Sequence, residues 1–393
     1  MSDADAVVIV GARRTPIGAF QGALAPVTAP QLGAVAMRAA LGDSGLEPGE
    51  LEEVIMGCVL SAGLGQAPAR QAALGAGVPA SVPATTINKM CGSGLKAVML
   101  AADQIRCGDI ELALAGGLES MSNAPYLLPK ARSGYRMGHA EVLDHMFFDG
   151  LQSPFDGELM GHFAEATARK YGFTRAAQDA FATESVRRAL QAIESGTFEA
   201  ETTPVTVKTR KGEVVVRQDE TPSTCDVSKI PSLKPAFAKD GTVTAASSSS
   251  ISDGAAALVL ARHSVAQRRG LRPLARIAAY ASHAQEPAWF TTAPAGAIRK
   301  VLATLGWAAR DVDLYEINEA FAVVTLAALR DLDLDPARVN VTGGACALGH
   351  PIGATGARLA VTLLHALERR KARRGIAALC IGGGEAVALA VER

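Results

Sequence analysis

Cysteine is scarce in this chain, and its spacing argues against the two architectures that depend on it most. Six cysteines occur in 393 residues, at positions 58, 91, 107, 225, 346 and 380. None forms a C-x-x-C pair, so we expect neither a disulfide framework nor a zinc ribbon, and no ligand cluster has metal spacing. Residues 1–6 resemble neither a signal peptide nor a transit peptide. These absences favour a reducing compartment and predict a cytoplasmic location.

Net charge and long apolar runs are also lacking. The chain has 39 Lys and Arg against 39 Asp and Glu, so its formal net charge is zero. A protein that works mainly by binding nucleic acid or an anionic membrane is therefore not expected. The longest largely apolar run, 320–329, is far shorter than the roughly 18 residues of a membrane span. We predict a soluble protein that binds neither nucleic acid nor a membrane.

Several common catalytic motifs are missing as well. Residues 10–14 (VGARR) follow a predicted strand but lack the G-x-G-x-x-G pattern of a dinucleotide site. The chain has no P-loop and no G-x-S-x-G motif, and the sequence CGSGL from Cys91 does not match a papain-like protease. Dinucleotide chemistry, nucleotide hydrolysis and these two hydrolase classes are therefore not predicted.

Strands and helices alternate in the first and last thirds of the chain. The first third has predicted strands at 6–10, 53–57, 85–90 and 111–115, and helices at 30–41, 67–74 and 95–106. The last third has predicted strands at 276–280, 313–317, 339–342 and 376–380, and helices at 297–305, 319–330 and 353–369. This alternation predicts an α/β fold, with helices on the faces of a mostly parallel sheet.

The two thirds also resemble each other. INKMCGSGLKAVMLAADQI precedes LALAGG, and VTGGACALGHPIGATGARLAVTLLHAL precedes AALCIGGG, so each is a strand, a glycine-rich turn, a helix and a strand that ends in glycines. We interpret this as an internal duplication. Residues 120–244 differ and are predicted to form an inserted loop domain with a hairpin at 205–217. The predicted domains are 1–119 plus 245–270, then 120–244, and finally 271–393.

Cys91 is the first candidate for chemistry. It lies in the turn MCGSG, directly before a predicted helix. Glycines let backbone N–H groups converge there, and a helix N-terminus favours negative charge. We therefore expect a lowered thiol pKa and a nucleophilic cysteine. The alternative is a buried cysteine that only packs.

Three further side chains lie at similar junctions. His350 follows a glycine before a predicted helix, where it either caps the turn or serves as a general base or oxyanion donor. Cys380 ends a predicted strand before three glycines, where it either packs or exchanges a proton with a carbon acid. Asn318 lies between a predicted strand and a helix, as an N-cap or as the holder of a water that stabilises an oxyanion.

Four segments occur together in one order: NKMCGSGLKA near 90, EINEAFA near 316, GGACALGHPIGATGAR near 343 and CIGGGEA at 380. With RTPIGAFQG, GQAPARQ, AGGLESMSNAPY and GTVTAASSSSISDGAAA, this set closely resembles the thiolase family over essentially the whole chain. The resemblance implies the thiolase fold, a duplicated five-layer αβαβα arrangement with a loop domain inserted in the N-terminal half. It agrees with the duplication inferred separately above.

The resemblance also implies a mechanism. Cys91 would form an acyl thioester, His350 would activate it, and Cys380 would remove the α-proton of a second acyl-CoA. Asn318 would hold a water that, with His350, stabilises the enolate oxygen, and the N–H groups of Cys91 and Gly382 would form the other oxyanion hole. No permanently bound cofactor is implied, since coenzyme A thioesters are the substrates. A homodimer or homotetramer is implied, with GQAPARQ near the dimer contact.

Six residues correspond to the coenzyme A contacts of the family: Ser249, Leu159, Met160, Phe237, Ala245 and Phe321. Leu159 departs from the family pattern, because biosynthetic members often carry His there. Phe290 also departs, since it opens a stretch that more often begins with Met-Gly. Both departures bear on acyl chain length.

The function predicted first is the reversible Claisen condensation of two acetyl-CoA into acetoacetyl-CoA and CoA. The alternative is a degradative 3-ketoacyl-CoA thiolase that acts on longer chains. A decarboxylative ketoacyl synthase normally lacks the thiol of Cys380, and a binding protein without turnover would not need all four polar groups.

Overall fold

One hydrogen-bonded sheet connects the two halves of the protein. The computed structural model describes residues 6–393. The strand order is β12-β13-β14-β11-β1-β10-β5-β3-β4, and β2 pairs with β10. The N-terminal half contributes β1 (Val7–Arg14), β2 (Gly18–Ala19), β3 (Glu53–Gly57), β4 (Ala84–Ile87), β5 (Leu112–Ser120) and β10 (Ser252–Arg262). The C-terminal half contributes β11 (Ala275–Ala284), β12 (Leu314–Ile317), β13 (Arg374–Ile381) and β14 (Glu385–Glu392).

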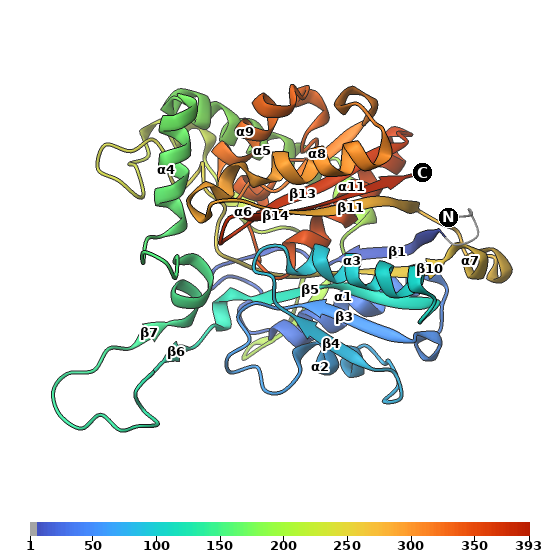
Figure 1. Cartoon of the computed structure of the whole chain (residues 1–393). Helices are drawn as coiled ribbons and strands as arrows, with labels where there is room; N and C mark the ends of the chain where they lie inside the picture. The colour runs from blue at the N-terminus through green and yellow to red at the C-terminus, as the bar shows by residue number, and fades with distance from the viewer. Residues whose placement is uncertain (1–5) are drawn as a thin grey trace.

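The strands of the two halves form separate layers that meet at one end (Figure 1). Only Val8 and Ile9 of β1 pair with Ala275 and Arg276 of β11. Helices α3 (Ser93–Cys107) and α11 (Thr355–Arg370) lie between the layers and contact strands of both halves. The outer faces carry α1 (Ala29–Ser44) and α2 (Pro68–Gly75) on one side, and α8 (Ala293–Leu305) and α9 (Ala322–Leu332) on the other. The predicted five-layer αβαβα fold is therefore confirmed.

The central helices pack against each other through glycine. A Cβ on Gly94 of α3 would lie 2.8 Å from the Ala357 nitrogen, and one on Gly356 of α11 would lie 2.5 Å from the Leu95 nitrogen. Neither position has room for a side chain, so the helices approach closely near their N-terminal ends. Their apolar faces join one core that includes Leu95, Leu359 and strand residues of both halves. The turns that precede α3 and α11 are thereby brought together.

The expectation of a mostly parallel sheet is wrong. Among the strands of residues 6–393, only the pairs β3–β4, β3–β5 and β12–β13 are parallel. β14 follows β13 after the three residues 382–384, and so short a connection can only join antiparallel strands. The sequence analysis did not predict β14. It also assigned a strand to 339–342, where the structure has only a bridge between Tyr315 and Val339.

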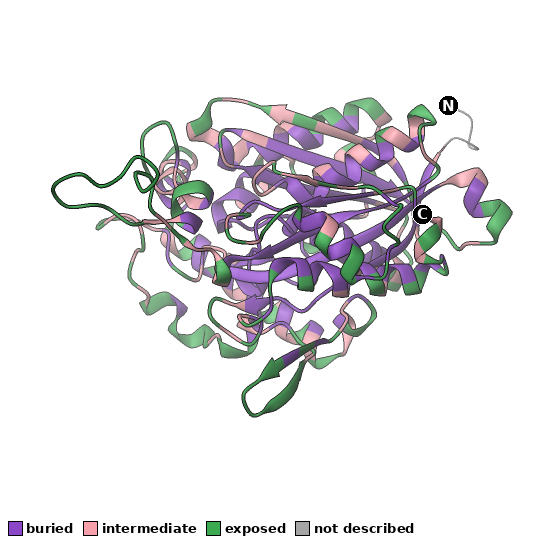
Figure 2. Cartoon of the chain, turned by 90° about the horizontal axis from the view of Figure 1, so that it is seen from below, coloured by how far each residue is buried: buried purple, intermediate pink, exposed green. Residues whose placement is uncertain are grey.

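The segment between β5 and β10 contains regular structure that the sequence analysis only partly predicted. Its elements are β6 (Tyr126–Leu127), β7 (Leu143–Asp144), α4 (Met160–Tyr171), α5 (Arg175–Glu194), β8 (Val205–Thr209), β9 (Gly212–Val216) and α6 (Thr221–Thr224). β8 and β9 pair antiparallel, which confirms the hairpin, whereas α4 and α5 were not predicted. Residues 128–142 form a protruding arm that is exposed throughout (Figures 1 and 2). The short helices α7 (His263–Arg269) and α10 (Ala345–Leu348) complete the chain.

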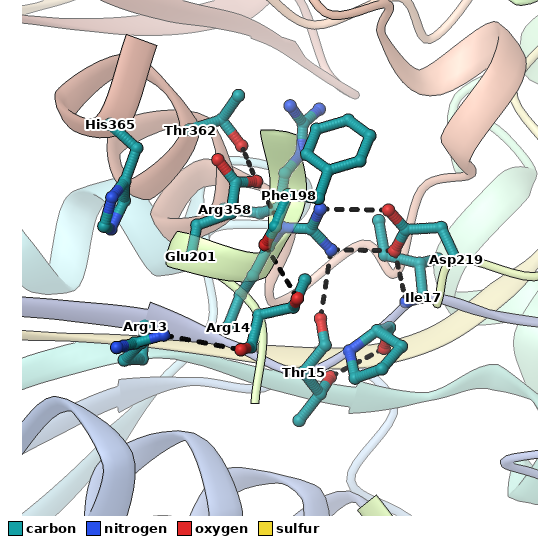
Figure 3. Close-up of polar contacts among 12 residues, drawn as sticks. Arg13, Arg14, Thr15, Ile17, Phe198, Glu201, Asp219, Arg358, Thr362 and His365 are labelled. Atoms are coloured by element: carbon teal, nitrogen blue, oxygen red, sulfur yellow. Dashed lines mark hydrogen bonds and ion pairs between the residues drawn. The ribbon is translucent and has the colours of Figure 1, made fainter. Parts of the chain in front are cut away.

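A buried ion cluster attaches the segment between β5 and β10 to the rest of the protein (Figure 3). The fully buried Arg14 at the end of β1 donates to Glu201 at 2.6 Å and to both carboxylate oxygens of Asp219 at 2.7 and 2.9 Å. Thr362 of α11 donates to Glu201 at 2.9 Å. A buried guanidinium is tolerated only when paired in this way. The cluster thus ties both carboxylate-bearing segments to β1 and the central helix layer.

Candidate active site

The turn that carries Cys91 is held by its own polar groups. The Ser93 hydroxyl accepts from the Lys89 N–H at 2.8 Å and donates to the Met90 carbonyl at 2.7 Å. Met90 has a φ of +46°, which is uncommon for a residue with a side chain. The Asn88 side chain accepts from the Met90 N–H at 2.9 Å. Together these contacts fix Cys91 just before the first turn of α3.

His350 is buried in a matching turn before α11. Its backbone N–H donates to the Ser250 carbonyl at 3.0 Å, and its Nδ1 lies 2.6 Å from the Thr355 hydroxyl. The Thr355 hydroxyl donates its single proton to the Pro351 carbonyl at 2.9 Å. It can therefore only accept from the ring, so the proton of the neutral imidazole is on Nδ1. The Nε2 lone pair is left available as a base.

Burial keeps this imidazole neutral. Burial, and then the charge of Arg358, lower the pKa of His350 from 6.5 to about 3. At neutral pH the ring can therefore take up a proton but does not hold one at rest. This is the state that a general base needs before it deprotonates a thiol.

Cys380 lies behind Cys91 at the end of β13. It is 1% exposed and packs in an apolar cluster with Phe290 and Phe321. Burial raises the pKa of Cys380 well above its ordinary value, and the nearby charge of Cys91 raises it further. The N–H groups of Gly382 and of Cys91 itself lie near the Cys91 sulfur and act to lower its pKa. The two thiols, one from each half of the chain, are therefore close enough for the charge of Cys91 to affect Cys380.

Asn318 lies between β13, which carries Cys380, and the side chain of His350. It is fully buried, and its backbone N–H donates to the Ala378 carbonyl at 3.0 Å. Its Nδ2 lies 3.5 Å from His350 Nε2, while its Oδ1 has no partner among the described residues. The neighbouring Glu319 carboxylate accepts from Ser185, Asn340 and the Cys346 N–H at 2.6 to 3.1 Å. These bonds fix the loop, so the unpartnered amide oxygen has a defined position.

A cavity of about 200 Å³ opens over these groups. Cys91, His350 and Gly382 line it, whereas Cys380 and Asn318 lie behind its wall. Five of the six residues predicted to contact coenzyme A also line it: Ser249, Leu159, Met160, Phe237 and Phe321. Ala245 is exposed and is not part of the lining. Within residues 6–393 there is no group of three or more His, Cys, Asp or Glu side chains that could hold a metal ion.

The expectation of a lowered pKa for Cys91 is wrong. Burial raises the pKa of the Cys91 thiol to about 11, although the N–H groups of Gly382 and Cys91 lower it in part. Desolvation of the thiolate therefore outweighs the stabilising N–H groups at this turn. Cys91 is therefore a neutral thiol at neutral pH, so it could act as a nucleophile only if a base took its proton.

Glu119 is a residue of the site region that the sequence analysis did not single out. It is fully buried on β5 and accepts from the N–H groups of Val59 and Leu60 at 3.0 and 3.1 Å and of Gly353 at 2.8 Å. It thereby ties the turn after His350 to the N-terminal half. Burial raises the pKa of Glu119 to about 7. A carboxylate inside the strand sequence LALAGGLES was the available signal.

Comparison with known proteins gives a consistent result along the chain. Residues 7–264 match the family model described as Thiolase, N-terminal domain, and residues 271–393 match Thiolase, C-terminal domain. The acetyl-CoA acetyltransferase of Pseudomonas aeruginosa is 54% identical over 98% of this chain and 99% of its own length. That of Escherichia coli K12 is 51% identical, with 98% of each chain covered. The crystal structure of the Bacillus anthracis acetyl-CoA acetyltransferase superposes with a TM-score of 0.96 at 46% identity, over 98% of each chain. No helix within residues 6–393 is long and apolar enough to cross a membrane.

Proposed function

The chain belongs to the thiolase family, and from that premise we propose that it catalyses the reversible condensation of two acetyl-CoA into acetoacetyl-CoA and CoA. The observation that carries this proposal is a cavity that Cys91 and His350 line, with Cys380 from the other half packed against Phe290 and Phe321 of its lining. Relatives at about half identity that bear the name acetyl-CoA acetyltransferase support the choice of acetyl groups.

The first half of the reaction forms an acyl-enzyme. His350 Nε2 takes the Cys91 proton, and the sulfur attacks the thioester carbonyl, whose developing oxyanion accepts from the Cys91 and Gly382 N–H groups. The bond from the carbonyl carbon to the Cys91 sulfur forms, and the bond to the CoA sulfur breaks. Cys380 protonates the departing CoA thiolate. At the end of this half the imidazolium of His350 faces the thiolate of Cys380.

The second half forms the carbon–carbon bond. The Cys380 thiolate removes the α-proton of the second acetyl-CoA, and the enolate oxygen is stabilised by protonated His350 Nε2 and a water on Asn318. The enolate carbon attacks the acyl carbonyl and expels the Cys91 thiolate. His350 returns its proton to Cys91, so both thiols and the neutral imidazole are restored. The raised pKa of Cys380 supports this cycle, because it keeps the acid protonated at rest.

The degradative alternative is not favoured. The aromatic ring of Phe290 is 3% exposed, lines the cavity and stands edge-on to Phe163 with 6.2 Å between centroids. Such a packed ring leaves little freedom for a longer acyl chain. Thiolysis rates with acetoacetyl-, 3-ketohexanoyl- and 3-ketooctanoyl-CoA test the proposal. We expect acetoacetyl-CoA to give the highest kcat/KM, and a clear preference for the longer chains would overturn it.

We also propose a division into three domains, which are 1–119 plus 245–270, then 120–244, and finally 271–393. We propose a cytoplasmic location as well.

We further propose that the protein is a homodimer or homotetramer. Apolar side chains that remain exposed on the single chain support self-association, since Tyr126, Met137 and Phe155 are 68%, 96% and 70% exposed. All three lie in the segment 120–244. Light scattering of the purified protein should give the mass of two or four chains, and a monomer would contradict this.

A further inference from the structure

The nucleophile turn and the turn that supplies Gly382 come from opposite ends of the sequence. Three contacts join them. The Gly382 N–H lies near enough to the Cys91 sulfur to lower its pKa, and Gly92 packs so closely on Ile381 that a Cβ there would lie 2.4 Å from the Ile381 side chain. The third contact is an ion pair between Lys89, two residues before Cys91, and Glu385, the first residue of β14.

We propose that the Lys89–Glu385 ion pair is a positioning device that holds the Gly382 N–H in place over the Cys91 sulfur. This inference rests on the proposed function, in which Gly382 donates to the developing oxyanion. Neither side chain of the pair lines the cavity. The pair acts through the two turns that it connects.

The β13–β14 pair Ile381–Glu385 closes the glycine turn 382–384, and the glycines themselves have few further contacts. Gly383 and Gly384 adopt φ values of +93° and +89°, and a Cβ built on Gly383 would meet nothing within 4 Å. A Cβ on Gly382 would meet only the Met160 sulfur, at 3.7 Å. The far side of the turn is fixed by the bond from the Gln285 N–H to the Gly384 carbonyl at 2.8 Å. The side that faces Cys91 depends on Ile381 and on the ion pair.

The Lys89 end is rigid enough to serve as the fixed point. Its N–H donates to Ser93 at the start of α3, and its carbonyl accepts from the Gly92 N–H at 3.0 Å. A displaced oxyanion donor costs rate steeply, because its stabilisation depends on the position where charge develops. A pair of modest strength can therefore matter more for catalysis than for stability, since partly exposed ion pairs contribute little to folding.

The role follows from position rather than from charge. The shift in the Cys91 pKa comes from burial, from two N–H groups and from Glu119, not from Lys89 or Glu385. Loss of either partner should therefore affect the rate in the same direction. An electrostatic role would instead give opposite effects, because unpaired Lys89 would favour the thiolate and unpaired Glu385 would disfavour it.

The test compares Lys89→Met, Glu385→Gln and the swapped double variant Lys89→Glu/Glu385→Lys. A matched control is Arg13→Met, because the Arg13–Asp43 pair has side-chain exposures of 25% and 35%, against 26% and 37% for Lys89 and Glu385. The measurements are the acylation rate of Cys91 by acetyl-CoA, followed by intact-protein mass, and kcat and KM in thiolysis over a pH series. Thermal unfolding checks that every variant is folded.

We expect each single variant to acylate and turn over about 10-fold more slowly, with KM within about twofold and an unchanged pH profile. The swapped variant should recover to within about threefold of the wild type, and Arg13→Met should match the wild type. Single variants that behave like Arg13→Met, or a swap no better than the single variants, would overturn the proposal. Opposite effects of the two single variants, with shifted pH profiles, would also overturn it in favour of a charge role.

Measurements on the wild-type protein separate the positioning role of the Lys89–Glu385 pair from the proposed thiolase reaction. Acylation of wild-type Cys91 with unaffected single variants rejects only the positioning role. A wild-type protein that never acylates at Cys91 rejects both the proposed function and the positioning role.

Discussion

Cys91 and Cys380 come from different halves and from different junctions of the duplicated pattern, one before a central helix and one at the end of a strand. Cys91 precedes a central helix, lines the cavity and receives the Gly382 N–H in addition to its own. Cys380 ends a strand and is 1% exposed, and within residues 6–393 its own N–H is the one donor that lowers its pKa. Burial raises both pKa values, to about 11 for Cys91 and well above the ordinary value for Cys380. A duplicated scaffold can therefore give two thiols different chemistry by placing them at different junctions, with different N–H groups and different access to solvent.

The largest effect should come from replacing Cys91, the thiol that two N–H groups face. Cys91→Ser should abolish acyl-enzyme formation and lower turnover by at least about 10³-fold, because a hydroxyl with the same base is a far weaker nucleophile toward a thioester. Intact-protein mass after exposure to acetyl-CoA measures the acyl group directly. A Cys91→Ser protein that still gains an acetyl group would place the nucleophile elsewhere.

Removal of the other sulfur should separate the two half reactions. Cys380→Ser should still acylate at Cys91, within about tenfold of the wild-type rate, but condensation should fall by about 10³-fold because the α-proton has no acceptor. Exchange of the acetyl α-hydrogens with deuterium from solvent follows the lost step. Normal condensation or normal exchange by this variant would contradict the acid/base assignment.

The sequence placed these residues better than it described their chemistry. Cys91, His350, Cys380 and Asn318 each lie at a turn between predicted elements, and short motifs specify such turns locally. The pKa of Cys91 was predicted in the wrong direction, because the motif shows the helix N-terminus but not the burial that other parts of the fold impose. Glu119 was not singled out for the same reason, since the N–H groups that it binds come from residues distant in the sequence.

The fold divides in a similar way. The α/β alternation and the duplication were readable because each half repeats a local pattern. Strand direction could not be predicted from that pattern. β10 pairs antiparallel with β5, which lies far before it in the chain, and β14 pairs antiparallel with β13, which it follows after a very short turn. Helices α4 and α5 were not predicted, because their buried faces mix small apolar residues, such as Ala164 and Ala182, with polar ones and so lack a clear apolar period.

A smaller effect should follow from the hydroxyl that orients His350. Thr355→Val keeps the shape but leaves the ring N–H without an acceptor, so the imidazole loses its fixed tautomer and orientation. We expect acylation to fall by about 10²-fold. Thr355→Ser retains the hydroxyl and should stay within about threefold of the wild type. Equal rates for the Val and Ser variants would show that this hydrogen bond does not serve the base.

The mildest test leaves the sequence unchanged and compares the two thiols by alkylation. Iodoacetamide reacts with the thiolate, so labelling of Cys91 should rise about tenfold per pH unit and level off near its pKa of about 11. Cys380 should lag behind at every pH, because burial raises its pKa well above the ordinary value and its side chain is only 1% exposed. Peptide mapping after brief exposure measures both sites in one sample. Faster labelling of Cys380 than of Cys91 would reverse the division of roles, since it would make the strand-end sulfur the more accessible thiolate.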